Sequence, residues 1–126
     1  MPTPEQVQSV IDAYVDGYRR NDKQAVLALF RPDAVWHDPV GAPPHVGHDG
    51  IGEFWDTAHS MADSIALVPR YVVVAGDEGV MVFEIHARTA AGTMIMDAVE
   101  VFTVGDDGKI VLLKAYWDMQ QARSGE

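Results

Sequence analysis

Hydrophobic residues recur with a helical period near the start of the chain and with alternating or continuous runs in its second half. One stripe at helical spacing consists of Val7, Val10, Ile11, Tyr14, Val15 and Tyr18. Thr3 followed by Pro4 is typical of a helix start, because Thr caps free N–H groups and Pro suits the first turn. The pattern therefore predicts a helix from Pro4 to about residue 20.

A second, shorter helix is expected after Asn21 and Asp22. Its apolar residues fall on one face, at Ala25, Val26, Leu29 and Phe30. Pro32 cannot continue a helix, so the segment 31–33 would end it. A short strand at 34–37 and a proline-containing loop at 40–47 are expected to follow.

A third helix would be capped by His48 or Asp49 and end near residue 60, burying residues such as Trp55. From residue 64 the pattern changes to β-branched and aliphatic runs separated by glycine-containing turns. Pro69 is expected to interrupt the first run like a bulge. The runs predict four strands, at 64–75, 80–89, 93–104 and 110–117.

Helices followed by an antiparallel meander are typical of α+β architecture. We expect three N-terminal helices packed on one strongly curved, mostly antiparallel sheet, a conical barrel that encloses an apolar pocket. Because no repeat or linker is visible, residues 1–126 should be a single domain. Its core would be 3–118, and 119–126 would be a loose tail.

Composition excludes several classes of function. The 126 residues contain no Cys, which excludes disulfides, thiolate metal sites and thiol nucleophiles. A net charge of −10 argues against nucleic acids and anionic membrane surfaces as partners. No signal peptide and no apolar run of about 20 residues is visible, so we expect a cytoplasmic protein without a membrane span.

One acidic residue stands where the strand pattern calls for an apolar one. Side chains two positions apart share a face of a strand. The face that holds Glu100 otherwise consists of Met94, Met96, Ala98, Phe102 and Val104. An unpaired charge there is unfavourable, so the carboxyl is expected to keep its proton and act as a hydrogen-bond donor. Donors in apolar pockets stabilise developing oxyanions.

Two further residues complete a candidate set. Tyr14 lies on the apolar stripe of the first helix, and Asp38 ends a strand just before Pro39. A carboxylate base with a phenol donor and a protonated carboxyl suits the removal of a proton next to a carbonyl, without metal or organic cofactor. Each residue also has an ordinary reading: Tyr14 as core, Asp38 as a turn residue, and Glu100 as the partner of a cation across a dimer interface.

Several motifs resemble a known family. They are residues 5–8 leading to Tyr14, Asp33-Ala34-Val35, His37-Asp38-Pro39-Val40-Gly41, Gly50-Ile51 with Glu53-Phe54-Trp55, and Gly108-Lys109-Ile110 leading to Ala115-Tyr116-Trp117. Together they resemble the Δ5-3-ketosteroid isomerases, within the nuclear-transport-factor-two-like (SnoaL-like) fold, over residues 3–118. The resemblance implies a conical barrel and a homodimer with one pocket per subunit. It also implies a steroid or similar hydrophobic ketone as substrate.

The resemblance also implies roles for single residues. Asp38 matches the general base that moves a proton from C4 to C6 of a 3-oxo-Δ5 steroid, and Tyr14 matches the oxyanion-hole tyrosine. Glu100 stands where the family has an aspartate. Trp55, Phe83 and Trp117 are expected to contact the substrate.

Two departures from the family pattern stand out. Glu100 is longer than aspartate by one methylene, about 1.5 Å, which displaces its hydrogen bond. Phe30 and Trp55 occupy positions where members of the family can carry tyrosines, so Tyr14 lacks those hydroxyl neighbours.

Alternatives remain at the level of the sequence. The same fold can serve a polyketide cyclase, a dehydratase, an epoxide hydrolase with an Asp-Arg-Asp set, or a hydrophobic-ligand-binding module without catalysis. His37, His45 and His48 cluster around the proline loop, but their spacing matches no zinc pattern, so no metal site is expected. Ile95, Val99 and Val101 would face away from Glu100, and an apolar outer sheet face predicts a dimer.

Overall fold

The computed structural model describes residues 1–125, and within them helices precede most of the strands. The helices are α1 (Pro4–Arg19), α2 (Lys23–Leu27), α3 (Gly47–Ser60) and the short 3-10 helix η1 (Met119–Gln121). The strands are β1 (Phe30–His37), β2 (His45–Val46), β3 (Ser64–Ala75), β4 (Glu78–Thr89), β5 (Gly92–Val104), β6 (Ile110–Tyr116) and β7 (Arg123–Gly125). In residues 1–125 no helix combines the length and the apolar character that crossing a membrane requires.

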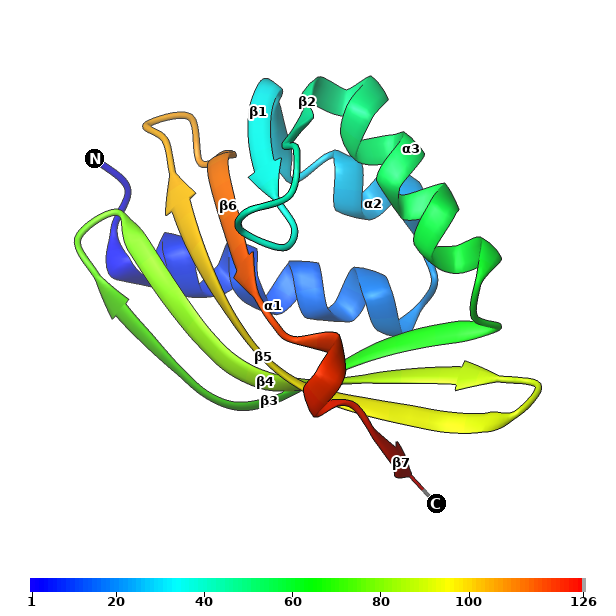
Figure 1. Ribbon diagram of the computed structural model, residues 1–126. Coiled ribbons are helices and arrows are strands. Elements are labelled where there is room, and N and C mark those ends of the chain that lie inside the picture. Colours follow the sequence, from blue (N-terminus) through cyan, green and yellow to red (C-terminus); the bar gives the residue numbers. More distant parts are fainter. Residues whose placement is uncertain (126) are drawn as a thin grey trace.

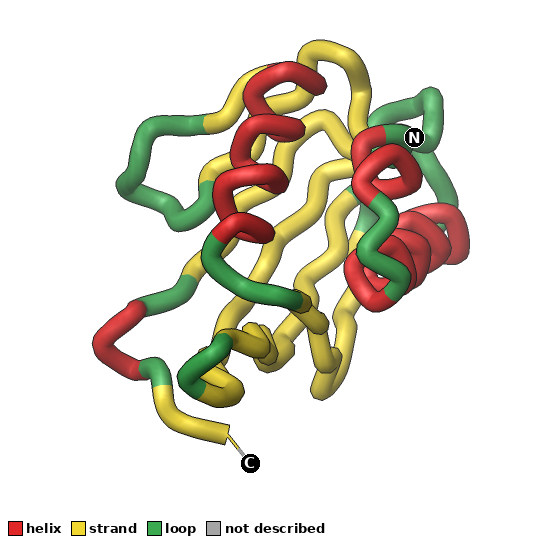
Figure 2. The backbone as a smooth tube through the Cα atoms, turned by 90° about the vertical axis from the view of Figure 1, so that its right-hand side faces the viewer, coloured by secondary structure: helices red, strands yellow, loops and turns green. Residues whose placement is uncertain are grey.

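The strands form one curled sheet in the order β2-β1-β6-β5-β4-β3, with β7 paired to β5. All neighbouring strands are antiparallel except β1 and β6, which are parallel. Figure 1 shows the long strands β3, β4 and β5 bending around α1, with α3 on the far side of the hollow. Figure 2 shows α3 and α1 on opposite sides of the sheet's concave face. The expected α+β fold is confirmed, although the sheet curls without closing into a barrel.

Two features set the position of α1: a capping box at its first turn and close packing of its buried face against the sheet. The Thr3 hydroxyl accepts from the backbone N–H of Gln6, and the Gln6 side chain accepts in return from the backbone of Thr3. A Cβ on Gly79 would lie 2.5 Å from Cδ1 of Ile11, so glycine there lets α1 approach β4 closely. This packing holds Tyr14 over the concave face of the sheet.

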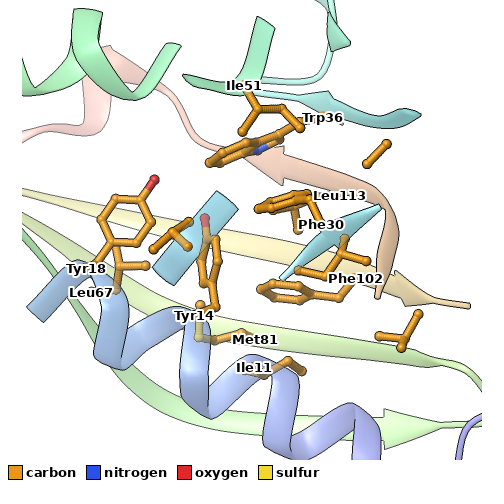
Figure 3. Packing of buried hydrophobic residues seen from close by; sticks show 14 of the residues in the cluster. Ile11, Tyr14, Tyr18, Phe30, Trp36, Ile51, Leu67, Met81, Phe102 and Leu113 are labelled. Carbon is orange, nitrogen blue, oxygen red and sulfur yellow. The ribbon is translucent and has the colours of Figure 1, made fainter. Parts of the chain in front are cut away.

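Aromatic residues fill the hollow between the helices and the sheet, as Figure 3 shows. The ring of Tyr14 meets the edges of Phe102 and Trp36 at centroid distances of 5.1 and 6.1 Å. Trp36 in turn stacks on Phe30 at 5.4 Å. Buried rings of this size dominate the packing energy, so they hold the Tyr14 ring in one orientation.

The prediction for the segment around residue 30 was wrong. The second helix ends at Leu27, and Phe30 begins β1 instead of lying on a helix face. Ile110 donates its backbone N–H to the Leu29 carbonyl, and Phe30 pairs with Ile110 of β6. Pro32 falls inside β1 at a register shift, where the missing N–H leaves no ladder bond broken. Pairing with a distant strand outweighed the local helical spacing.

The other predicted boundaries differ less from those of the structure. The third helix begins at Gly47, whose φ of 70° suits glycine, and no side chain caps it, so His48 and Asp49 are not its caps. The bulge expected at Pro69 is confirmed by a register shift between Pro69 and Tyr71.

The expectation of a loose tail was wrong for the described residues 119–125. These residues form η1 and then β7, which pairs with Thr93, Met94 and Ile95 of β5. Arg123 also reaches Glu84 at 2.9 Å. Sequence polarity suggested disorder here, but edge pairing and an exposed ion pair order the segment. Residue 126 lies outside the described residues.

Candidate active site

A mostly apolar cavity of about 110 Å³ opens between the helices and the concave face of the sheet. Its apolar wall consists of Phe54, Ala58, Ile65, Leu67, Phe83, Ile85, Met96 and Trp117. Four ionisable side chains, those of Tyr14, Tyr18, Asp38 and Glu100, line the same space. Apolar walls with a few convergent polar groups are typical of a small-molecule site.

Glu100 points into this cavity from the middle of β5. Its position opposite Met81 and Ala115 places it on the buried face, where it is 3% exposed. The Tyr14 hydroxyl donates to Oε2 at 3.1 Å, while Oε1 is buried with no partner among residues 1–125. Burial raises the pKa of Glu100 well above its usual value, the negative charge of Asp38 raises it further, and the Tyr14 hydrogen bond only partly opposes them. Burial therefore favours the neutral, protonated form of the carboxyl.

Tyr14 reaches the cavity from the buried face of α1 and is 1% exposed. Burial raises the pKa of Tyr14 well above 10, and the carboxyl of Glu100, when it is ionised, raises it further. The phenol therefore keeps its proton. A protonated carboxyl can donate as well as accept, so Glu100 can accept from Tyr14 and still offer its own proton to a ligand.

Asp38 follows β1 directly and precedes Pro39 through a cis peptide bond. The Val40 N–H donates to the Ala115 carbonyl at 2.8 Å, which fixes this loop against β6. The Trp117 Nε1–H donates to Oδ1 of Asp38 at 2.6 Å. Burial raises the pKa of Asp38 to about 6, although the Trp117 hydrogen bond lowers it. Asp38 is therefore the more readily ionised of the two carboxyl groups in the cavity.

The predicted substrate-contacting residues fall in two groups. Phe83 and Trp117 line the cavity, but Trp55 is not among the lining residues. Trp55 packs behind Tyr18, with ring centroids 4.7 Å apart, and is 5% exposed. The reason is the helical rotation of α3, which turns Phe54 and Ala58 toward the cavity and Trp55 toward α1.

Sequence reasoning missed part of the cavity wall. Tyr18 had been counted only as core, although its spacing of four residues from Tyr14 places both on one helix face. The inward alternation of β3 and β4 would have identified Ile65, Leu67 and Ile85. Only the curvature of the sheet, which the pattern does not encode, brings them to one space.

The histidines near the proline loop have other roles. His48 Nε2 hydrogen-bonds the Phe30 carbonyl at 2.8 Å, and His45 stacks on Phe54 at 4.3 Å. Across residues 1–125, no three His, Asp or Glu side chains are close enough to hold a metal ion.

Comparison with known proteins places this geometry in a family. The model of the SnoaL-like domain matches residues 11–113, most of the chain. The chain belongs to the SnoaL-like family. A curated relative, the "Steroid Delta-isomerase" of Nocardioides simplex, is 29% identical over 114 residues, covering 89% of each chain.

Solved structures share the SnoaL-like cone fold. RV0760c from Mycobacterium tuberculosis superposes with a TM-score of 0.88 at 19% identity, covering 99% of this chain and 100% of that one. The epoxide hydrolase/cyclase-like enzyme SalBIII is described in pyran ring formation in polyether salinomycin. It superposes with a TM-score of 0.87 at 19% sequence identity, covering 99% of this chain and 100% of that one. At these identities the structures show the fold alone. The resemblance drawn from the motifs is thus confirmed at the level of the family.

In this SnoaL-like chain the two carboxyl groups have different surroundings, which can be tested without a substrate. Replacing Trp117 with Phe should raise the pKa of Asp38 above about 6, because the indole N–H stabilises the ionised form. Carbon-13 NMR titration of the Asp38 carboxyl measures it. Trp55→Phe is the matched control and should leave that pKa unchanged. An equal or lower Asp38 pKa in Trp117→Phe would contradict the assigned hydrogen bond.

Proposed function

We propose that this protein isomerises a 3-oxo-Δ5 steroid, or a similar hydrophobic β,γ-unsaturated ketone, to its conjugated Δ4 form without a cofactor. The observation that carries the proposal is one apolar cavity that holds an ionised Asp38 together with the neutral Tyr14–Glu100 pair. The named activity of the Nocardioides simplex relative supports it. A neighbouring structure of RV0760c in complex with estradiol-17beta-hemisuccinate supports a steroid-sized ligand.

The proposed reaction needs only proton transfers. Asp38 takes a proton from C4, and the electron pair of that C–H bond moves toward the carbonyl oxygen to give a dienolate. Glu100 donates a hydrogen bond to that oxygen as its charge develops, and the Tyr14 hydroxyl, which donates to Oε2 of Glu100 in the free protein, turns its proton to the same oxygen. Asp38 then returns the proton to C6, which places the double bond in conjugation and restores the starting carboxylate. A base with a pKa of about 6 is ionised at neutral pH yet still basic enough for this step.

The size of the cavity restricts how such a ligand can bind. Drug-sized ligands occupy pockets of roughly 300–1,000 Å³, whereas this cavity measures about 110 Å³. The enclosed part therefore fits the ring that carries the ketone. The remaining rings would lie at the mouth, and the side chains there would have to move apart.

The epoxide-hydrolase alternative fits the structure less well. Its Asp-Arg-Asp set needs an arginine at the reacting centre, and no arginine lines the cavity among residues 1–125. Arg70 instead bonds Glu84 and Asp97, which share the outer face of the sheet.

Turnover of 5-androstene-3,17-dione tests the isomerase proposal. The absorbance of the conjugated enone should rise in the presence of micromolar enzyme, and Asp38→Asn should lower the rate by about 100-fold or more, because general-base catalysis contributes roughly 10²–10⁴-fold. Asp33→Asn, which removes an exposed acid from the same strand, is the matched control and should keep full activity.

Two results would count against the isomerase. One is a rate no higher than that of buffer, and the other is an Asp38→Asn variant that is as active as the parent. Activity on cyclisation or dehydration substrates instead would favour another SnoaL-like reaction, and tight ligand binding without turnover would favour a binding module.

We further propose that two copies pair through the outer face of the sheet. Tyr71, Val82, Val99 and Tyr116 form one row across β3, β4, β5 and β6. Tyr71 and Tyr116 are 61% and 44% exposed, and Val73 in the adjacent row is 57% exposed. A contiguous apolar surface over four strands is typical of a protein–protein interface.

Sedimentation equilibrium should therefore give twice the monomer mass, and Val73→Asp should shift the protein toward monomer because a charge would be buried in the interface. Val46→Asp is the matched control, since Val46 is equally exposed but lies on β2 at the other edge of the sheet. A parent protein that stays monomeric at high micromolar concentration would rule out this pairing.

A further inference from the structure

Tyr18 is a second tyrosine in the cavity, and neither the family motifs nor the proposed reaction gives it a role. It lies one helical turn after Tyr14 on the buried face of α1, and the two ring centroids are 5.1 Å apart. Figure 3 shows both hydroxyl groups directed away from α1 in the same sense. Both residues line the cavity that also holds Glu100 and Asp38. The Tyr18 hydroxyl is thus placed beside the Tyr14–Glu100 pair.

The hydrogen bonds of the pair leave the Tyr18 proton available. Tyr14 donates its single hydroxyl proton to Oε2 of Glu100. The Tyr18 side chain is 8% exposed, and its hydroxyl contacts that of Tyr14 as an acceptor, which lowers the Tyr18 pKa and leaves the Tyr18 proton free to be donated. A hydroxyl that lines a cavity and keeps its proton free can donate a hydrogen bond to a ligand there.

Burial keeps Tyr18 a donor. It raises the pKa of Tyr18 well above 10, and the carboxyl groups of Glu100 and Asp38, when ionised, raise it further. The phenol therefore stays protonated at neutral pH. It cannot serve as a base, so what it can offer a ligand is a hydrogen bond to an oxygen.

The ring of Tyr18 is also held from behind. Trp55 packs against it at 4.7 Å, and His59 stacks on Trp55 at 4.0 Å. His59 Nδ1 hydrogen-bonds the Trp55 carbonyl at 2.9 Å, which fixes the imidazole on the same helix. A donor that is fixed before the ligand arrives needs no reorganisation when negative charge develops. This packing also explains why Trp55 lies behind the cavity wall.

We propose that Tyr18 is a further catalytic residue, whose hydroxyl donates directly to the ligand oxygen beside Glu100 and Tyr14. It supplies the additional hydroxyl that Phe30 and Trp55 cannot provide at their positions. The inference rests on one part of the proposed function, namely that the end of the ligand buried in the cavity is an oxygen that gains negative charge. Three neutral donors around one point select ligands that end in an enolate-like or phenolate-like oxygen.

Ligand binding tests this role independently of turnover. The probes are 2-naphthol, which presents an acidic hydroxyl, and 2-methoxynaphthalene, which has nearly the same shape but no ionisable oxygen. Their dissociation constants are measured by fluorescence titration at pH 8 for the parent protein, Tyr18→Phe and Tyr71→Phe. Tyr71 lies on the outer face of the sheet, in the proposed pairing surface and outside the cavity, and Tyr71→Phe keeps its ring there, so it serves as the matched control.

Tyr18→Phe should weaken the binding of 2-naphthol by about 10-fold or more, the effect of losing one hydrogen bond to a charged oxygen, and should leave 2-methoxynaphthalene within twofold. Tyr71→Phe should change neither. Equal weakening of both ligands would show a merely structural role, and unchanged naphthol binding would also overturn the proposal. If Tyr18→Phe does not fold, as judged by thermal unfolding, Tyr18→Leu is measured in the same way. A failed isomerase assay together with selective loss of naphthol binding would refute the isomerase and retain Tyr18 as a ligand donor.

Discussion

The structure depends on one buried hydrogen bond, between the Tyr14 hydroxyl and the carboxyl of Glu100. It joins α1 to the middle of β5 across the hollow of the sheet, where almost every other neighbour is apolar. An ionised carboxylate with one phenol partner would be poorly compensated in such surroundings, since a buried charge needs a counter-charge or several hydrogen bonds. The constraint therefore fixes the protonation state of Glu100, and that state makes the cavity a hydrogen-bond-donating site.

The same fold gives two carboxyl groups different surroundings. Glu100 lies in mid-strand with one oxygen unpartnered, so burial dominates and it stays neutral. Asp38 lies at the end of β1, where the Trp117 indole donates to it and limits the rise of its pKa to about 6. The negative charge of Asp38 also raises the pKa of Glu100, so ionising Asp38 further disfavours ionising Glu100. A base and a neutral donor can therefore coexist in one small cavity at neutral pH.

Much of this site could be read from the sequence because its signals are local. Glu100 interrupts an alternating strand, and Asp38 precedes a proline at the end of a strand. The positions of Trp55 behind the cavity wall and of Tyr18 in that wall could not be read in the same way, because they depend on how α3 and α1 pack against each other. Phe30 and the segment 119–125 were misjudged for a related reason: they pair with β6 and β5, strands whose partners the local pattern does not specify.

The protonation of Glu100 can be observed directly by infrared spectroscopy. At pH 8 the other acidic side chains should be ionised, so one carboxylic-acid carbonyl band should remain in the parent protein. That band should be absent from Glu100→Gln, which preserves shape and a partner for Tyr14 but has no acid group. A spectrum without the band, in a folded parent protein at pH 8, would mean that Glu100 is charged and would contradict the account.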